Sequence, residues 1–126
     1  MVLDASAIIA LVLREAGHEA VAEAIGQGLT SLSAVNATEA LTRLARIGLD
    51  PRRMLASLQR LGIDIIAFGV DDAVIAAELA PHTQALGLSL GDRACLALGR
   101  RLGVAVVTAD RAWARLDVGI EVRLIR

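Results

Sequence analysis

Two aspartates stand at the ends of short apolar segments, where a carboxylate is well placed to do chemistry. Asp4 follows the apolar residues 1–3, and Asp110 follows the apolar segment 104–107 after two small residues. Burial without a partner can raise the pKa of a carboxylate by roughly 3–5 units, each equivalent to about 1.4 kcal/mol. Two strands that each deliver an aspartate at the carboxyl end therefore indicate acids gathered around a cation.

Two further acids, Glu39 and Asp92, are expected on helices. A helix over residues 33–47 places Glu39 on its polar face, where one interpretation is an exposed ion pair with Arg43, worth a few tenths of a kcal/mol. Asp92 falls in the first turn of a helix, where a favourable interaction with the helix dipole is the ordinary explanation. A functional role for Glu39 and Asp92 is nevertheless supported, because Asp4 and Asp110 at the strand ends already need a partner.

Together these acids favour a hard metal cation, because packed carboxylates repel one another and cannot all ionise without a counter-charge. Ligation by oxygen alone suits Mg²⁺ or Mn²⁺. Such an ion can activate water and stabilise the leaving oxygen in phosphodiester cleavage. The chain has neither common glycine-rich nucleotide-binding motif, no lysine, and only two histidines, His18 and His82, both expected at the surface. The residues thus permit metal-assisted phosphoryl hydrolysis.

Alternating short strands and helices must position these acids. Strands are expected over residues 1–4, 29–32, 63–68, 104–108 and 120–125. Helices are expected over residues 5–14, 17–25, 33–47, 50–61, 71–80, 91–102 and 111–116, with mixed structure or loop over 81–90. Asp71 or Asp72 is expected to cap the helix over 71–80, and Asp64 to lie at a sheet edge or in solvent. This order predicts one α/β domain over residues 1–126, with a mostly parallel sheet covered by helices on both faces.

Composition limits the remaining possibilities. At 56% hydrophobic residues, the 126-residue chain exceeds the usual value of about 45–50%, as a sheet covered on both faces requires. No apolar segment reaches the roughly 18 residues of a membrane span, and the N-terminus lacks the basic residues of a secretory signal. We therefore expect a cytoplasmic protein without a membrane partner. The single Cys95 permits neither an internal disulfide nor a cysteine zinc site.

All 13 basic residues are arginine, and five of them lie within residues 43–60 against one acid, Asp50. They are Arg43, Arg46, Arg52, Arg53 and Arg60. Such a patch can hold phosphates through bidentate contacts. The charge by itself is explained equally well by a helical face that is simply exposed to solvent.

Four segments of the chain resemble the PIN-domain ribonucleases, and most closely the VapC-type toxins of bacterial toxin–antitoxin pairs. The segments are MVLDASA at 1–7, AVNATE at 34–39, LSLGDRACLA at 88–97 and VTADRAW at 107–113. The resemblance covers essentially the whole chain and has all four motifs in order. It implies a three-layer α/β/α sandwich around a short, mostly parallel sheet, and an endoribonuclease dependent on Mg²⁺ or Mn²⁺. It also implies a homodimer and a small cognate antitoxin whose C-terminal segment enters the cleft.

The resemblance also implies roles for individual residues. The acids match the catalytic and metal-ligand positions, which are Asp4, Glu39, Asp92 and Asp110. Three residues match small polar positions lining the pocket, namely Ser6, Asn36 and Thr108, although Ser6 and Thr108 could equally be turn residues. Apart from the resemblance, the density of arginine around the polar face of Glu39 predicts residues that hold RNA or the antitoxin, namely Arg43, Arg46, Arg52 and Arg53. Asp117 either reaches the edge of the site or is a surface acid.

Two other functions stay open at this level. One is a PIN-fold nuclease that processes RNA without an antitoxin. The other is a non-catalytic module that binds RNA or protein, which the intact set of four acids argues against, because a pure binder gains nothing from negative charge where phosphates must sit.

Overall fold

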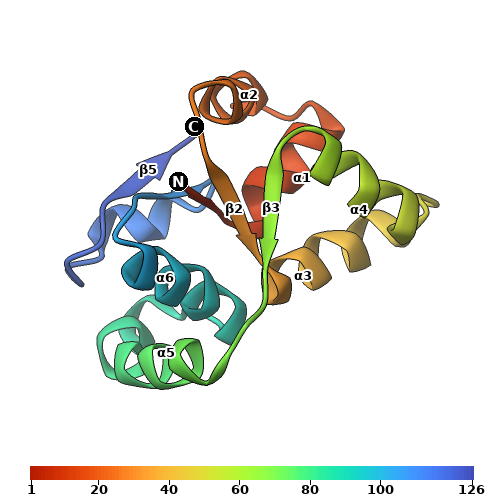
Figure 1. Ribbon diagram of the computed structural model, residues 1–126. Coiled ribbons are helices and arrows are strands. Elements are labelled where there is room, and N and C mark those ends of the chain that lie inside the picture. The colour runs from red at the N-terminus through yellow and green to blue at the C-terminus, as the bar shows by residue number, and fades with distance from the viewer.

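Five parallel strands form one sheet in the computed structural model, which describes residues 1–126 (Figure 1). The strands are β1 (Val2–Leu3), β2 (Thr30–Ser33), β3 (Ile63–Ile66), β4 (Val106–Thr108) and β5 (Val122–Leu124). They lie in the order β3-β2-β1-β4-β5. Asp64 is exposed on the edge strand β3, as predicted. The predicted α/β class with a parallel sheet is confirmed.

Six α-helices and two 3₁₀ helices join the strands. They are α1 (Ala5–Leu13), α2 (His18–Gly26), α3 (Ala34–Ala45), α4 (Pro51–Arg60), α5 (Val70–Thr83), η1 (Gln84–Leu86), α6 (Leu90–Leu102) and η2 (Arg111–Arg115). The start of α4 follows directly from sequence, because the side chain of Asp50 accepts a hydrogen bond from the backbone N–H of Arg53 at 2.8 Å and Pro51 takes the first helical position. None of the helices is both long and apolar enough to cross a membrane.

The strands send alternate side chains into two apolar layers. In β1, Leu3 packs into one buried cluster and Val2 into the other, and Val107 and Val106 of β4 divide in the same way. Figure 1 shows α5 and α6 on one side of the sheet and α1 and α4 on the other. A parallel sheet covered on both faces needs apolar side chains in both directions, which explains the continuous apolar character of its strands. The predicted sandwich is present.

The chain reverses its direction across the sheet between β1 and β4. It passes outward from β1 through β2 to β3, and then returns to place β4 on the other side of β1. Sheets of this kind leave a crevice at such a point, beyond the carboxyl ends of the strands. Asp4 directly follows β1 and is the N-cap of α1, and Asp110 follows β4 and is the N-cap of η2. Both aspartates therefore lie at this crevice.

Residues 81–90 have mixed structure, as predicted, but the helix before them extends beyond its expected end at residue 80. Helix α5 continues to Thr83 with Pro81 in its last turn, and η1 follows at once. Thr83 is fully buried, and its hydroxyl donates to the backbone oxygen of Leu79 at 3.0 Å. Pro81 and His82 in this turn are exposed, and the buried Thr83 anchors the helix beyond the proline, a residue that ordinarily interrupts a helix.

The start of α5 also differs from the prediction, because Gly69, rather than Asp71 or Asp72, is the N-cap. Asp72 lies in the first turn, where it accepts a hydrogen bond from the backbone N–H of Gly69 at 3.0 Å. It also accepts two hydrogen bonds from Arg101 of α6, at 2.7 and 3.2 Å. Burial by itself raises the pKa of Asp72, but the donors outweigh burial and lower the pKa below its ordinary value. This ion pair ties α5 to α6.

Asp72→Asn is expected to lower the free energy of unfolding at pH 7 by about 1–3 kcal/mol, because Arg101 loses its charged partner. Since the folded-state pKa of Asp72 lies below its unfolded value of about 3.9, the contribution is fully present above that pH. It is lost as the pH falls through the folded-state value. Urea unfolding between pH 7 and pH 2 measures both effects. Glu78→Gln, which changes an exposed acid of the same helix, is the matched control. An Asp72→Asn protein as stable as the parent at pH 7 would contradict this account.

Candidate active site

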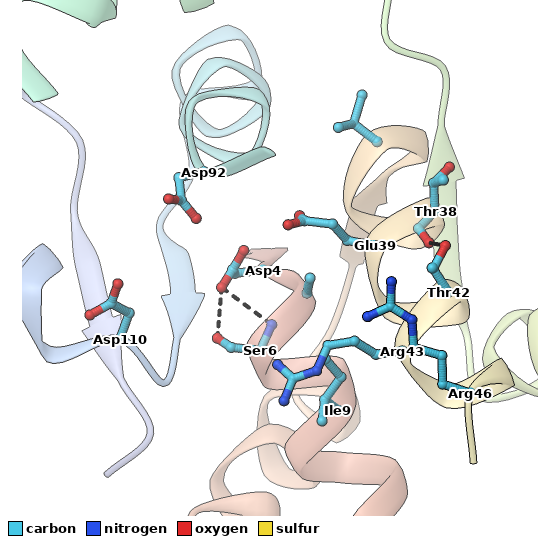
Figure 2. A pocket seen from close by; sticks show the side chains of 12 residues that line it. Asp4, Ser6, Ile9, Thr38, Glu39, Thr42, Arg43, Arg46, Asp92 and Asp110 are labelled. Atoms are coloured by element: carbon cyan, nitrogen blue, oxygen red, sulfur yellow. Dashed lines mark hydrogen bonds between the residues drawn. The ribbon is translucent and has the colours of Figure 1, made fainter. Parts of the chain in front are cut away.

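A cavity of about 700 Å³ opens where Asp4 and Asp110 leave β1 and β4 (Figure 2). Its walls come from the first turns of α1 and α6, from α3 and from the residue that caps η2. The lining residues are Asp4, Ala5, Ser6, Ile9, Val35, Thr38, Glu39, Thr42, Arg43, Arg46, Asp92 and Asp110. The fold thus brings together all four acids that the sequence singled out.

Asp4 is buried and held by neutral donors. Only 4% of its surface is exposed. Its Oδ2 accepts hydrogen bonds from the Ser6 hydroxyl at 2.6 Å and from the Thr108 hydroxyl at 3.1 Å. Its Oδ1 accepts a longer hydrogen bond from Asn36 Nδ2 at 3.4 Å. Charge-assisted hydrogen bonds of this kind fix a carboxylate without neutralising it.

The same hydroxyls connect Asp4 to the segment after β4. The Ser6 hydroxyl accepts from the backbone N–H of Ala109 at 3.0 Å, and the Thr108 hydroxyl accepts from that of Asp110 at 3.1 Å. Ser6 lines the cavity, whereas Thr108 is fully buried behind it, as is Asn36. The expectation that all three polar residues line the pocket is therefore wrong for Thr108 and Asn36, which reach it only through the carboxylates they contact.

Glu39 is held by Asn36 of its own helix rather than by an ion pair with Arg43. Its Oε2 accepts a hydrogen bond from Asn36 Nδ2 at 3.4 Å, and no ion pair joins it to Arg43. Partial burial of its carboxyl group, followed by the negative charges of Asp4 and Asp92, raises the pKa of Glu39, while Arg43 lowers it to a smaller extent. The simple explanation of Glu39 as half of a surface ion pair therefore fails.

Asp92 belongs both to a helix cap and to the cavity. Its Oδ2 accepts a hydrogen bond from the backbone N–H of Ser89 at 2.7 Å, and the Ser89 hydroxyl accepts from the N–H of Asp92 at 3.2 Å. This capping box starts α6. Burial first, and then the charges of Asp4 and Asp110, raise the pKa of Asp92 against the lowering effect of Ser89. Asp117, in contrast, is exposed and does not line the cavity.

The four acids face one cavity but stand apart from one another. No group of three or more histidine, cysteine or acidic side chains is close enough to hold an ion with the side chains as they stand. Oxygen atoms are nevertheless the only strong ligands that these side chains offer, and their negative charge has no ionic partner. This donor set fits a hard divalent cation chemically.

The structure divides the four arginines that were expected to bind RNA or the antitoxin. Arg43 and Arg46 of α3 line the cavity, and neither forms an ion pair. Figure 2 shows them on the α3 side, across from Asp92. Arg52 and Arg53 of α4 do not line this cavity, and Arg53 borders a separate one of about 290 Å³. Charge density along the sequence could not separate these two pairs.

Residues 1–119 match the family model described as the PIN domain. The chain belongs to the PIN-domain family. No curated protein sequence matches the chain. The family match agrees with the four motifs and with the cavity in which their acids meet.

Solved structures similar to this PIN domain share its fold over nearly the whole chain. A toxin–antitoxin complex from Klebsiella pneumoniae has a TM-score of 0.73 at 19% identity, covering 99% of this chain and 97% of that one. A DNA-bound VapBC from Salmonella typhimurium has a TM-score of 0.72 at 17% identity, covering 99% and 97%. A VapC from Mycobacterium tuberculosis, described as a toxin that cleaves the sarcin–ricin loop, has a TM-score of 0.68 at 19% identity, covering 92% and 95%.

Gly91 is a site residue of this PIN domain that the sequence analysis missed. A β-carbon at this position would overlap the carboxylate of Glu39. The carbonyl oxygen of Gly91 accepts a hydrogen bond from Asn36 Nδ2 at 3.0 Å. Gly91 therefore lets α6 approach α3 closely enough for Glu39 and Asp92 to face the same cavity. Little in the sequence signals this role, because Gly91 is the first residue of the helix expected over 91–102, and glycine is tolerated at helix starts.

Gly91→Ala is expected to lower the free energy of unfolding by less than about 1 kcal/mol, because the added methyl group has to displace only the end of the flexible, exposed Glu39 side chain. Glu39→Ala in the same chain removes the overlap and should recover most of the loss in urea unfolding. Gly26→Ala is the matched control, because a β-carbon there meets nothing within 4 Å. An equal loss from Gly91→Ala with and without the Glu39 carboxylate would show that the overlap is not the cause.

Proposed function

We propose that this PIN domain is a metal-dependent endoribonuclease that acts as the toxin of a toxin–antitoxin pair. One observation carries the proposal: a single cavity holds four carboxylates from four segments of the chain beside two arginines without ionic partners. Such carboxylates suit a cation, and such arginines suit phosphate. Among the structures with this fold are toxin–antitoxin complexes and a toxin that cleaves the sarcin–ricin loop, which supports the proposal.

In this proposal, Asp4, Glu39, Asp92 and Asp110 would hold Mg²⁺ or Mn²⁺. A bound ion of this kind supplies activation of water and stabilisation of the leaving oxygen. The hydroxyls that bind Asp4 keep one carboxylate in a fixed orientation whatever else occupies the cavity. Arg43 and Arg46 would bind phosphate groups of the RNA on the α3 side.

We assign a groove beside the cavity to the antitoxin. It has a volume of about 570 Å³ and is lined by Thr38, Leu41, Thr42, Ala45, Arg46 and Pro51, three of which also line the acidic cavity. The hydroxyls of Thr38 and Thr42 donate to backbone oxygens of α3 at 2.8 and 2.7 Å. These hydroxyls are thereby satisfied within α3, which leaves a largely apolar surface. An apolar segment of the partner could lie there and continue into the cavity.

The partner distinguishes this function from RNA processing without an antitoxin. Growth arrest on expression, relieved by the product of a neighbouring gene, would support the toxin assignment. A purely binding module is disfavoured, because carboxylates repel the phosphates that such a module must hold. The homodimer stays a prediction. Ile47 and Leu61, which follow α3 and α4, are 61% and 54% exposed and offer apolar surface to a second copy.

Asp4→Asn and Asp92→Asn are each expected to reduce RNA cleavage by at least about 100-fold, because each removes a negative charge from the proposed cation site. Far-UV circular dichroism should show an intact fold. EDTA should abolish cleavage by the parent protein, and Mg²⁺ or Mn²⁺ should restore it. Asp64→Asn, which changes an exposed acid on the edge strand, is the matched control. Parental cleavage by Asp4→Asn, or full activity in EDTA, would refute the four-carboxylate site.

Replacing Arg43 and Arg46 by Ala should weaken RNA binding and make it less sensitive to salt, because each lost phosphate contact reduces the slope of log K against log salt by about 0.7 for single strands. Titrations of a fluorescent RNA at several salt concentrations measure the slope. Replacing Arg52 and Arg53 by Ala removes the same charge outside the cavity and provides the matched comparison. Equal slopes for the two double variants would assign all four arginines to general attraction.

A further inference from the structure

One buried amide links three of the segments that carry the acids. Asn36 lies in the first turn of α3 and is fully buried. Its Nδ2 lies 3.4 Å from Asp4 Oδ1, 3.4 Å from Glu39 Oε2 and 3.0 Å from the carbonyl oxygen of Gly91. Because Asn36 does not line the cavity, it would contact neither RNA nor a cation there. It acts through the groups that it holds.

The orientation of this amide is fixed by the oxygens around it. An amide nitrogen has two hydrogens, and the nitrogen of Asn36 faces three acceptors. Its own Oδ1 is buried and has no donor. Turning the amide over would set Oδ1 against three oxygens, so the other orientation is excluded. A buried oxygen without a donor is uncommon in proteins, and its presence beside the acids calls for an explanation in terms of the site.

We propose that Asn36 is a positioning residue whose amide acts as a neutral spacer, holding the Asp4 and Glu39 carboxylates at a fixed separation and anchoring Gly91 beside them. An arginine or lysine in this place would neutralise the acids, and a further acid would add to their repulsion. An amide can donate one hydrogen to the Gly91 oxygen at 3.0 Å and share the other between the two carboxylates at 3.4 Å, and it leaves their charge in place. The inference rests on the proposed function for the use of that charge, but the spacer itself operates in the metal-free protein.

A double-mutant cycle in EDTA tests the spacer without any metal or RNA. Asn36→Ala should lower the melting temperature, and the loss should shrink by about 3 °C or more in a Glu39→Gln background, where one of the two charges is gone. Thr83→Val is the matched control, because it removes a buried hydrogen bond within α5 and outside the cavity. The fall in melting temperature caused by Thr83→Val should be the same with Glu39 and with Gln at position 39. If Asn36→Ala does not fold, Asn36→Ser enters the same cycle.

A second measurement separates positioning from simple loss of stability. Asn36→Ala should weaken Mn²⁺ binding and lower kcat for RNA cleavage by about 10–100-fold, with KM nearly unchanged, whereas Thr83→Val should alter neither. Equal losses of melting temperature with Glu39 and with Gln at position 39 would overturn the spacer. Parental Mn²⁺ affinity and kcat in Asn36→Ala would overturn its role in the site. A parent protein that neither binds Mn²⁺ nor cleaves RNA would refute the proposed function, while the cycle in EDTA would still decide the spacer.

Discussion

Negative charge without an ionic partner is the constraint on which the rest of the site depends. Burial, together with the charges of neighbouring acids, raises the pKa of Glu39 and of Asp92. The same protein treats the buried Asp72 differently: it accepts two hydrogen bonds from Arg101, and its pKa falls despite burial. In the cavity, Asp4 is bound only by hydroxyls, an amide and a backbone N–H. The fold thus fixes the position of the acids and preserves their charge.

The parallel sheet supplies this neutral support. Strands β1 and β4 are neighbours and end at the same edge, so the residues that follow them can share hydroxyl groups. Helices α1, α3 and α6 place residues of their first turns on the same cavity. The exposed peptide dipoles at helix N-termini carry partial positive charge, which eases the repulsion between carboxylates without adding a cation. A site of this kind therefore needs several segments that begin or end together, which one helix cannot provide.

Pattern in the sequence predicts the class of the fold and the acids that meet, because apolar runs and helix signals constrain which segments end at one sheet edge. How deeply a residue is buried, and which distant residues it contacts, do not follow from these patterns. Ser6, Asn36 and Thr108 are all small polar residues beside an acid, yet only Ser6 reaches the cavity. The close approach at Gly91 depends on a side chain from another helix. Helix α5 likewise continues past Pro81 to the buried Thr83, a burial that no local rule reports.

Because Glu39 and Arg43 form no ion pair, both the acids and the arginines of the cavity are free to bind ligands. Four residues apart on one helix, they are spaced for an ordinary surface pair. Asn36 holds Glu39 instead, and Arg43 influences it only through its charge. If the two side chains were paired, a cation would have to displace the guanidinium and a phosphate would have to displace the carboxylate before either could bind. Held apart, the acids and the arginines can receive ligands of opposite charge at the same time, which cleavage of a phosphodiester beside a cation requires.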